Sequence, residues 1–267
     1  MTAKTVSNGQ PSLAAERRER IAELVMHKGA VHISELTQRY GVSEVTIRHD
    51  LDVLASQGVV VRERGGALAN VQTTLAKAFE QRSDVNPEAK RRIGQRAAQL
   101  VKPGDTIIMD AGTTVMEMAR HVRDVAPLTV ITNALNVASQ VGGLAGCHVI
   151  LTGGSLSIET ISTVGPLAER DFGELIVGKL FLGAHTVDLE AGIVDTSIEV
   201  ARVKRAMIQA ARETILLVDS SKWETHRREA FARVAPLTAV HQIITDSGLP
   251  DDVRPAIERL RIELTVV

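Results

Sequence analysis

The sequence predicts an α/β protein in two parts, a small winged helix-turn-helix followed by a larger Rossmann-like domain with a parallel sheet. Three observations support this prediction. Apolar residues repeat at helical spacing on both sides of Gly41, and an alternating segment with a Gly-Gly pair follows at 59–68. From residue 106 onward, short apolar runs alternate with helix-compatible stretches, which is typical of a parallel sheet covered on both faces.

The first part is expected to span residues 15–69, after a polar, disordered tail at 1–14. A helix over 15–27 opens it. Gly41 then permits a tight turn between two further helices, and Ser43 is suited to cap the second of them. Gly58 ends that helix, and the wing follows as a two-stranded hairpin. The inward stripes of the two helices contain Ile33, Leu36, Tyr40, Ile47, Leu51 and Leu54.

The outer face of the second helix is short and polar, as in helices that enter a DNA major groove. A small helical subdomain that packs on another part of the chain is the alternative. Charge does not decide between them, since residues 1–70 hold nine Lys/Arg and eight Asp/Glu. The arginines nevertheless lie on the outer helix face and in the wing, where they can contact phosphates. The candidate DNA contacts are Ser43, Thr46, Arg48, His49, Arg62 and Arg64.

Composition limits the function classes. The chain has 267 residues, enough for two domains, and its formal net charge of −1 does not indicate a membrane surface as partner. Only 2% of residues are aromatic, which argues against stacking on single-stranded nucleic acid. A single cysteine, Cys147, excludes an intrachain disulfide and fits a reducing cytosol. No signal peptide or membrane span is recognisable, and the eight histidines lack metal-ligand spacing, so we expect a cytoplasmic protein without metal or cofactor.

Residues 70–87 lack sustained periodicity and are expected to connect the two parts. Pro87 then begins a helix, and the second domain is expected over 88–267. Its predicted strands are 106–110, 128–133, 148–154, 179–184, 214–221, 241–246 and 264–267.

Several of these strands end in small polar residues. Ligands of open α/β sheets bind beyond the carboxyl ends of the strands, so we expect these residues to meet at one pocket. In the segment DAGTT at 110–114, Gly112 lets the backbone approach a ligand, and Thr113 and Thr114 can hold a phosphate. An ordinary capped turn is an equal alternative. The segment is neither G-x-G-x-x-G nor a Walker loop, which argues against dinucleotides and ATP.

Residues 40–68, YGVSEVTIRHDLDVLASQGVVVRERGGAL, resemble the DNA-binding segment of the DeoR family of bacterial sugar-metabolism repressors. That family has V-S-x-x-T-I-R-x-D-L-x-x-L, then a glycine, then a wing that ends in G-G-A. The chain is similar in particular to the N-acetylgalactosamine-pathway repressors of the family. The resemblance covers residues 16 to about 250. The matching residues are Val42, Ser43, Thr46, Ile47, Arg48, Asp50, Leu51, Leu54, Gly58, Gly65, Gly66 and Ala67.

The resemblance implies that the second domain is similar to ribose-5-phosphate isomerase and binds a phosphorylated sugar or a related metabolite. It places Lys90, Thr113 and Thr114 at the phosphate. It places Asp110, Asn133, Asp188, Glu199 and Lys222 at the sugar. The full set of candidate effector contacts is Lys90, Asp110, Gly112, Thr113, Thr114, Thr132, Asn133, Gly153, Gly154, Asp188, Glu199 and Lys222.

One residue pair within the resemblance has a second interpretation, and one segment departs from the family pattern. Glu199 and Lys204 stand where the family pattern has them, but a surface pair on one helix is an equal interpretation. The family's G-x-D-G-I-D reads G-A-H-T-V-D at 183–188, so His185 stands where a carboxylate is usual and Thr186 replaces a glycine.

Together these observations predict a transcriptional regulator, a repressor of a sugar-catabolic operon whose DNA affinity changes with a phosphorylated sugar. Its partners would be double-stranded operator DNA, the effector and further copies of the chain, as a dimer or a tetramer, because paired half-sites need paired readers. An activator could use the same architecture. The alternative is a sugar-phosphate isomerase with a DNA-binding appendage, in which Asp188, Glu199 and Lys222 act as general acids and bases. His185 in place of a carboxylate argues against the isomerase.

Overall fold

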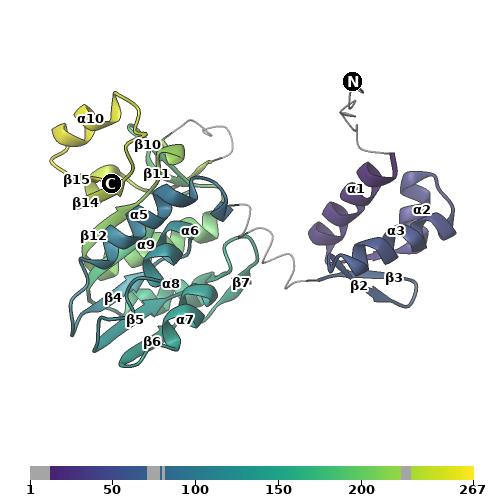
Figure 1. Cartoon of the computed structure of the whole chain (residues 1–267), viewed down its shortest axis with the longest axis horizontal. Coiled ribbons are helices and arrows are strands. Elements are labelled where there is room, and N and C mark those ends of the chain that lie inside the picture. Colours follow the sequence, from purple (N-terminus) through teal and green to yellow (C-terminus); the bar gives the residue numbers. More distant parts are fainter. Residues whose placement is uncertain (1–12, 71–78, 80–81, 224–229) are drawn as a thin grey trace, which may run out of the picture. The chain divides into compact units, whose positions relative to one another are not determined.

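The computed structural model describes residues 13–70, 79, 82–223 and 230–267. The chain forms two compact units, residues 1–78 and 79–267, and each is described by itself (Figure 1). The tail predicted at 1–14 lies outside the described residues except for its last two, which already belong to the first helix. Most of the connector predicted at 70–87 lies outside them as well.

The first unit is a three-helix winged fold. Its elements are α1 (Leu13–Lys28), β1 (Ala30–His32), α2 (Ile33–Tyr40), α3 (Glu44–Ser56), β2 (Val60–Glu63) and β3 (Gly66–Ala69). Gly41 ends α2 with φ 65°, the left-handed conformation that glycine adopts without strain. The side chains of Ile21, Leu36, Ile47 and Leu51 are fully buried between the helices. The predicted helix-turn-helix is therefore confirmed.

The wing has three strands, in the order β1-β3-β2, where two were predicted. β1 is only three residues long and buries a single side chain, Val31, so it leaves too short a pattern to be recognised. Gly66 permits the pairing of β1 with β3, because a Cβ at this position would lie 2.0 Å from the Val31 carbonyl oxygen.

The second unit is built on a seven-stranded sheet in the order β15-β14-β12-β9-β4-β5-β6, in which all neighbouring strands are parallel. Every strand predicted from an apolar run lies in this sheet. The strands are β4 (Thr106–Met109), β5 (Leu128–Thr132), β6 (Cys147–Leu151), β9 (Val177–Gly183), β12 (Ala211–Leu217), β14 (Gln242–Thr245) and β15 (Glu263–Val266).

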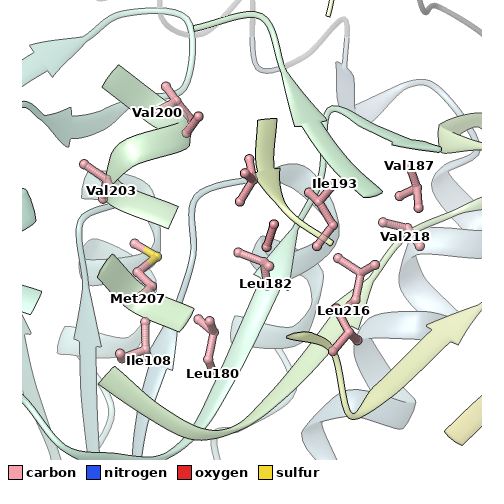
Figure 2. Close-up of a cluster of buried hydrophobic side chains, with 14 of the residues drawn as sticks. Ile108, Leu180, Leu182, Val187, Ile193, Val200, Val203, Met207, Leu216 and Val218 are labelled. Atoms are coloured by element: carbon pink, nitrogen blue, oxygen red, sulfur yellow. The ribbon is translucent and has the colours of Figure 1, made fainter. Parts of the chain in front are cut away.

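Helices cover both faces of the sheet. One face packs against α5 (Pro87–Ala98), α6 (Thr113–Ala119) and α7 (Leu135–Gly142), and the other packs against α8 (Pro166–Gly173), α9 (Ile198–Ala210) and α10 (Val253–Arg259). Successive residues of β4 serve the two cores in turn, since Ile107 and Met109 face α5–α7 and Ile108 faces α8–α10. Figure 2 shows the second of these cores, in which Met207 of α9 lies near Ile108 and Leu180.

The strand order reverses next to β4. The chain runs from β4 through β5 to β6 on one side, and then returns to β9 on the other side and continues outward to β15. Loops that follow β4 and β9 therefore leave in opposite directions, which opens a crevice at the carboxyl edge of the sheet.

Several short elements of the second unit were not predicted. β10 (Thr186–Asp188), β11 (Gly192–Asp195) and β13 (Ala232–Ala235) form a small antiparallel sheet, and β7 (Ser155–Ser157) pairs with β8 (Ser162–Val164) in a hairpin. α8 and the short 3-10 helices η1 (Ser220–Lys222) and η2 (Leu237–Ala239) complete the unit. Strands of three or four residues carry too few alternations to be separated from loops. Within the described part of the chain, no helix is long and apolar enough to cross a membrane.

Candidate functional site

The outer face of α3 carries four of the residues predicted to contact DNA. Ser43, Arg48 and His49 are exposed and Thr46 is partly exposed, whereas Asp50 beside them is buried. The Ser43 and Thr46 hydroxyl oxygens lie 2.9 Å apart, and Ser43 Oγ also accepts the backbone N–H of Thr46. α3 therefore begins with a hydrogen-bonded cap and presents a polar face to solvent.

Two of the predicted arginines form ion pairs in the absence of DNA. Arg48 donates to the Glu44 carboxylate at 2.8 Å, one helical turn away. Arg62 donates to Asp52 Oδ1 at 2.9 Å and to the Gly66 carbonyl at 2.8 Å. An exposed pair such as Arg48–Glu44 contributes only about 0.3–0.5 kcal/mol, so a phosphate can replace the carboxylate. Arg62 instead ties the wing to α3 and sets their relative position.

Arg64 lies in the turn between β2 and β3, next to Gly65, whose φ of 88° favours glycine. Its side chain is exposed, and it forms no ion pair with any residue that the structure describes. Arg64 can therefore meet a DNA phosphate without first breaking an internal contact.

A buried ion pair holds α3 against α1, and sequence reasoning did not find it. Asp50 is 1% exposed, and its two carboxylate oxygens accept Arg17 Nε at 2.6 Å and Arg17 Nη2 at 3.2 Å. Asp50 belongs to the R-x-D-L segment of the family pattern, but a sequence pattern does not show which cation it meets 33 residues earlier. Its role is to orient α3, since its side chain points away from the exposed face.

The second unit contains a cavity at the carboxyl edge of the large sheet, where the strand order reverses. Its volume is about 70 Å³, room for several water molecules or part of a small polar ligand. The loops after β4 and β9 form two of its sides, and α9 and η1 contribute further side chains. Its polar lining residues include Arg82, Thr113, Thr114, Glu159, His185, Asp195, Ser197, Lys204 and Lys222.

A buried cluster of three ionisable side chains lies at this cavity, and burial raises the pKa of one of them, Asp110. Lys204 Nζ is 3.4 Å from Asp110 Oδ2 and 3.4 Å from Asp195 Oδ2, and it donates to the Gly183 carbonyl at 2.9 Å. The Gly183 N–H in turn donates to Asp110 Oδ2 at 3.0 Å. Burial lowers the pKa of Lys204, but the two carboxylates more than offset this and hold that pKa above its usual value. Lys204 is thus a buried cation, and its interpretation as half of a surface pair with Glu199 is wrong.

The charged forms of the other two basic side chains at the cavity, Lys222 and Arg82, are less stable than they would be in water. Burial lowers the pKa of Lys222, and the neighbouring positive charges of Arg82 and Lys204 lower it further, against the attraction of Asp219. Burial also lowers the pKa of Arg82, whose guanidinium donates to the Glu159 carbonyl. The Lys222 ammonium group forms no hydrogen bond or ion pair with any residue that the structure describes, although the backbone N–H of Lys222 donates to the Asp219 carbonyl. The arrangement favours an incoming anion, because an anion would relieve the repulsion between these cations.

His185 also lines the cavity, half-buried, in the loop after β9. Burial lowers the pKa of its imidazole, and the cations Lys222 and Lys204 lower it as well, while Asp195 opposes them. The imidazole is therefore neutral at neutral pH and can donate one hydrogen bond and accept another.

The structure brings together four of the residues predicted for the effector. Thr113, Thr114 and Lys222 line the cavity, and Asp110 lies in the charge cluster beneath it. Gly112 comes directly before α6 with φ 149°, a backbone conformation that a side chain would strain.

Lys90, Thr132 and Asn133 are not among the residues that line the cavity. Lys90 is 2% exposed, and its Nζ donates to the backbone carbonyl of Arg82, so it supports the segment that carries Arg82. Thr132 Oγ1 accepts the N–H of Ala134, and the Asn133 side chain donates to the Thr163 carbonyl. These groups are used in internal hydrogen bonds.

Four further predicted residues also lie outside the cavity lining. The Gly153 N–H donates to Asp171 Oδ2 at 3.0 Å, so a carboxylate already occupies this amide. Gly154 has φ 135°, and a Cβ there would meet the Val164 carbonyl oxygen at 2.6 Å, so the β7–β8 hairpin requires this glycine.

Asp188, at the end of the short strand β10, and Glu199, at the start of α9, also lie outside the cavity lining. Asp188 Oδ1 accepts two backbone N–H groups of the following turn, and the residue lines a second cavity on the small sheet, of about 280 Å³, together with Phe231 and Arg233. Glu199 is exposed on α9 and accepts the Ser197 hydroxyl at 2.9 Å.

Strand order explains the position of Gly153 and Gly154. Strands lie about 4.8 Å apart, and β6, which precedes both glycines, is the edge strand two places from β4. The cavity instead uses Arg82, His185, Asp195, Ser197 and Lys204. Only the His185 and Lys204 positions were singled out from sequence. Asp195 ends β11 of the small sheet, which left no recognisable pattern. Among the described residues no group of three or more His, Cys, Asp or Glu could hold a metal ion.

Two family models match the chain, and they divide it as the fold does. Residues 17–73 match the DeoR-like helix-turn-helix domain, and residues 85–247 match the DeoR C-terminal sensor domain. The second match covers more than half of the 267 residues.

Curated relatives match over nearly the whole length. The chain is 38% identical to a helix-turn-helix-type transcriptional regulator, YulB, of Bacillus subtilis (strain 168), over 96% of this chain and 97% of the relative. It is 34% identical to a putative aga operon transcriptional repressor of Escherichia coli O157:H7, over 95% of this chain and 94% of the relative.

Among solved structures, the chain is similar to ribose 5-phosphate isomerase A of Methanocaldococcus jannaschii. That likeness has a TM-score of 0.38 at 18% identity over 52% of this chain and 55% of the isomerase, and it is too weak to support an activity. The relatives that match along the whole chain are regulators, which favours the regulator prediction over the isomerase alternative. The protein belongs to the DeoR family of transcriptional regulators, with an N-terminal helix-turn-helix DNA-binding domain and a C-terminal sensor domain.

Proposed function

We propose that the protein represses a sugar-catabolic operon, and that a phosphorylated sugar bound in the sensor cavity weakens its hold on operator DNA. The observation that carries this proposal is that the cavity lining holds charges of both signs. Its cations are Lys222 and Arg82, and its carboxylates are Asp195 and Glu159. A phosphorylated sugar offers a partner to each kind of group, a phosphate to the cations and hydroxyl groups to the carboxylates.

Lys222 and Arg82 are the proposed phosphate ligands. Burial lowers the pKa of both side chains, and neighbouring cations lower that of Lys222 further, so a bound dianion would stabilise their charged forms. The Thr113 and Thr114 side chains line the same cavity and can supply hydroxyl hydrogen bonds. Lys90 is proposed to act indirectly, through its hydrogen bond to the Arg82 carbonyl.

The sugar hydroxyl groups are proposed to donate hydrogen bonds to the cavity carboxylates, above all to Asp195. Asp195 is fixed by Lys204 at 3.4 Å, and its Oδ1 accepts the Thr196 N–H at 2.8 Å. A fixed carboxylate loses little freedom when it accepts a hydroxyl, which favours binding. His185 can add one donor and one acceptor, so the position where the family has a carboxylate remains polar here.

The winged helix is proposed to place α3 in the major groove, with Arg64 at the phosphates beside it. Ser43, Thr46, Arg48 and His49 are proposed contacts from α3. Two copies of the chain would read two half-sites, and the effector would act by binding more tightly to the form with low DNA affinity. The protein would act in the cytoplasm and would catalyse no reaction. The relative named as an aga operon repressor supports the sign of the regulation.

Binding to DNA from directly upstream of the gene tests the proposal, with ribose 5-phosphate, glucose 6-phosphate, fructose 6-phosphate and glycerol 3-phosphate as effectors. We expect one of these compounds to weaken a specific complex. Lys222→Gln should lower the affinity of the protein for that compound about tenfold or more, which corresponds to the loss of a hydrogen bond to a charged group. The matched control is Lys102→Gln, an exposed lysine before β4 at the opposite edge of the sheet.

Two outcomes would contradict the proposal. Equal effects of Lys222→Gln and Lys102→Gln would remove Lys222 from the phosphate site. Turnover of ribose 5-phosphate by the purified protein, lost in Lys222→Gln, would restore the isomerase alternative.

A further inference from the structure

Val45 is an apolar side chain on the polar face of the DNA-binding helix. It is the second residue of α3 and is 77% exposed. The inward apolar residues of the same helix, Ile47, Leu51 and Leu54, are 0%, 0% and 3% exposed. Val45 therefore contributes nothing to the core of the unit through its side chain.

Local structure does not account for a valine at this position. A β-branched residue is a weaker helix former than Ala, Lys or Glu, and it compensates for this only when it packs. Elsewhere in the same unit, the exposed Val61 pairs directly across the wing with the exposed Leu68, so these two side chains shield each other. Val45 is surrounded instead by polar neighbours.

Those neighbours are engaged with one another. The Ser43 and Thr46 hydroxyl groups lie 2.9 Å apart, and Glu44 accepts Arg48 at 2.8 Å. The first turn of α3 thus presents an outward apolar surface, the two methyl groups of Val45, between polar groups that are already paired. In a major groove, one base has an apolar group at its edge, the 5-methyl group of thymine.

We propose that Val45 reads a thymine in each operator half-site by contact with the 5-methyl group. The inference rests on the proposed placement of α3 in the major groove. First-turn residues of a recognition helix are the ones that reach base edges, and Val45 is the exposed aliphatic residue of that turn. One buried methyl group corresponds to about 0.8 kcal/mol, which predicts a preference for thymine over uracil of about fourfold per half-site.

Uracil is the matched probe, because it pairs like thymine and differs only by the absent methyl group. A binding site is first selected from random-sequence duplex DNA with the full-length protein. Each thymine of that site is then replaced by uracil, one at a time, and affinity is measured for the wild type, for Val45→Ala and for a control, Ile176→Ala. Ile176 is 80% exposed and lies in the sensor unit.

We expect one thymine per half-site at which uracil weakens the wild type and the control about fourfold. The same replacement should leave Val45→Ala unchanged, since the side chain that senses the methyl group is gone. Val45→Ala should retain the folded winged unit, because the residue is exposed.

Three results would overturn the inference. The first is that uracil has no effect at any position in the wild type, and the second is that uracil weakens Val45→Ala as much as it weakens the wild type. In both cases specific DNA binding would persist, so the proposed function would stand while the role of Val45 would fall. Failure to select any site would reject the proposed function and the inference together.

Discussion

The ion pair between Arg17 and Asp50 predicts an unequal response to removal of its two members. The Asp50 side chain, on the buried face of α3, is 1% exposed, whereas the Arg17 side chain is 18% exposed and has a path to water. We consider Arg17→Met, Asp50→Asn and the double variant Arg17→Met/Asp50→Leu. The two single changes remove the same pair and leave different groups behind.

Burial sets the size of each effect. Arg17→Met leaves a carboxylate uncompensated in the interior, which costs about 3–5 kcal/mol. Asp50→Asn leaves a guanidinium that can turn toward solvent, so the loss is closer to that of a charged hydrogen bond, about 1.5–3 kcal/mol. A unit of this size has a free energy of unfolding of roughly 3–8 kcal/mol, so Arg17→Met brings the winged unit to the edge of unfolding. The double variant removes both charges and should recover much of the loss.

The two units can be followed separately in the intact protein, because the chain has one tyrosine and one tryptophan. Tyr40 lies in the winged unit and Trp223 lies in the sensor unit. In urea unfolding, the Tyr40 transition should occur at the lowest urea concentration in Arg17→Met, at a higher one in Asp50→Asn and at the highest in the wild type. The Trp223 transition should stay at the same urea concentration in all three. Equal shifts for the two single variants, or a double variant less stable than Arg17→Met, would refute the reasoning.

Two further predictions concern charge. Arg64→Ala should lower the slope of log affinity against log salt concentration by about 0.9, the value for one lost phosphate contact, in DNA titrations at several salt concentrations, and an unchanged slope would exclude the wing contact. Burial and nearby cations lower the pKa of His185, so its imidazole is neutral before the effector binds. The negative charge of a bound anion should raise that pKa and cause the imidazole to take up a proton, so effector affinity should rise as pH falls below neutral. Calorimetry across this pH range should show a smaller rise in His185→Gln, in which only the titration of the phosphate itself remains.

Helices and strands could be predicted from the sequence where a repeating pattern of apolar residues marks them. The spacing of Ile47, Leu51 and Leu54 predicted α3, and all three side chains are buried as expected. The continuous apolar runs predicted the strands of the large sheet, because a parallel strand covered on both faces shows its burial directly in its composition. Short strands such as β1 and β11 lack such a pattern, and they were missed.

The sensor cavity was harder to predict because it depends on strand order. Thr113 and Lys222 could be found from loops that follow apolar strands, and both line the cavity. The same reasoning also selected Gly153, which lies after β6 and whose amide is occupied by Asp171. Nothing in the sequence states that β9 lies beside β4, and it is this neighbour relation that decides which strand ends share a cavity.

The charge cluster at the cavity gives the sensor a further property. Lys204 is shared between Asp110 and Asp195. Burial raises the pKa of Asp110, and the Asp195 carboxylate lines the cavity beside the cations Lys222 and Arg82. A buried pair of this kind contributes little to stability compared with an apolar replacement, so its retention is better explained by what it offers a ligand. A bare dianion would meet the cations and also the repulsion of the cluster. A ligand that places its anion on Lys222 and its hydroxyl groups on Asp195 avoids that repulsion, and the cavity therefore favours a phosphorylated polyol over inorganic phosphate or sulfate.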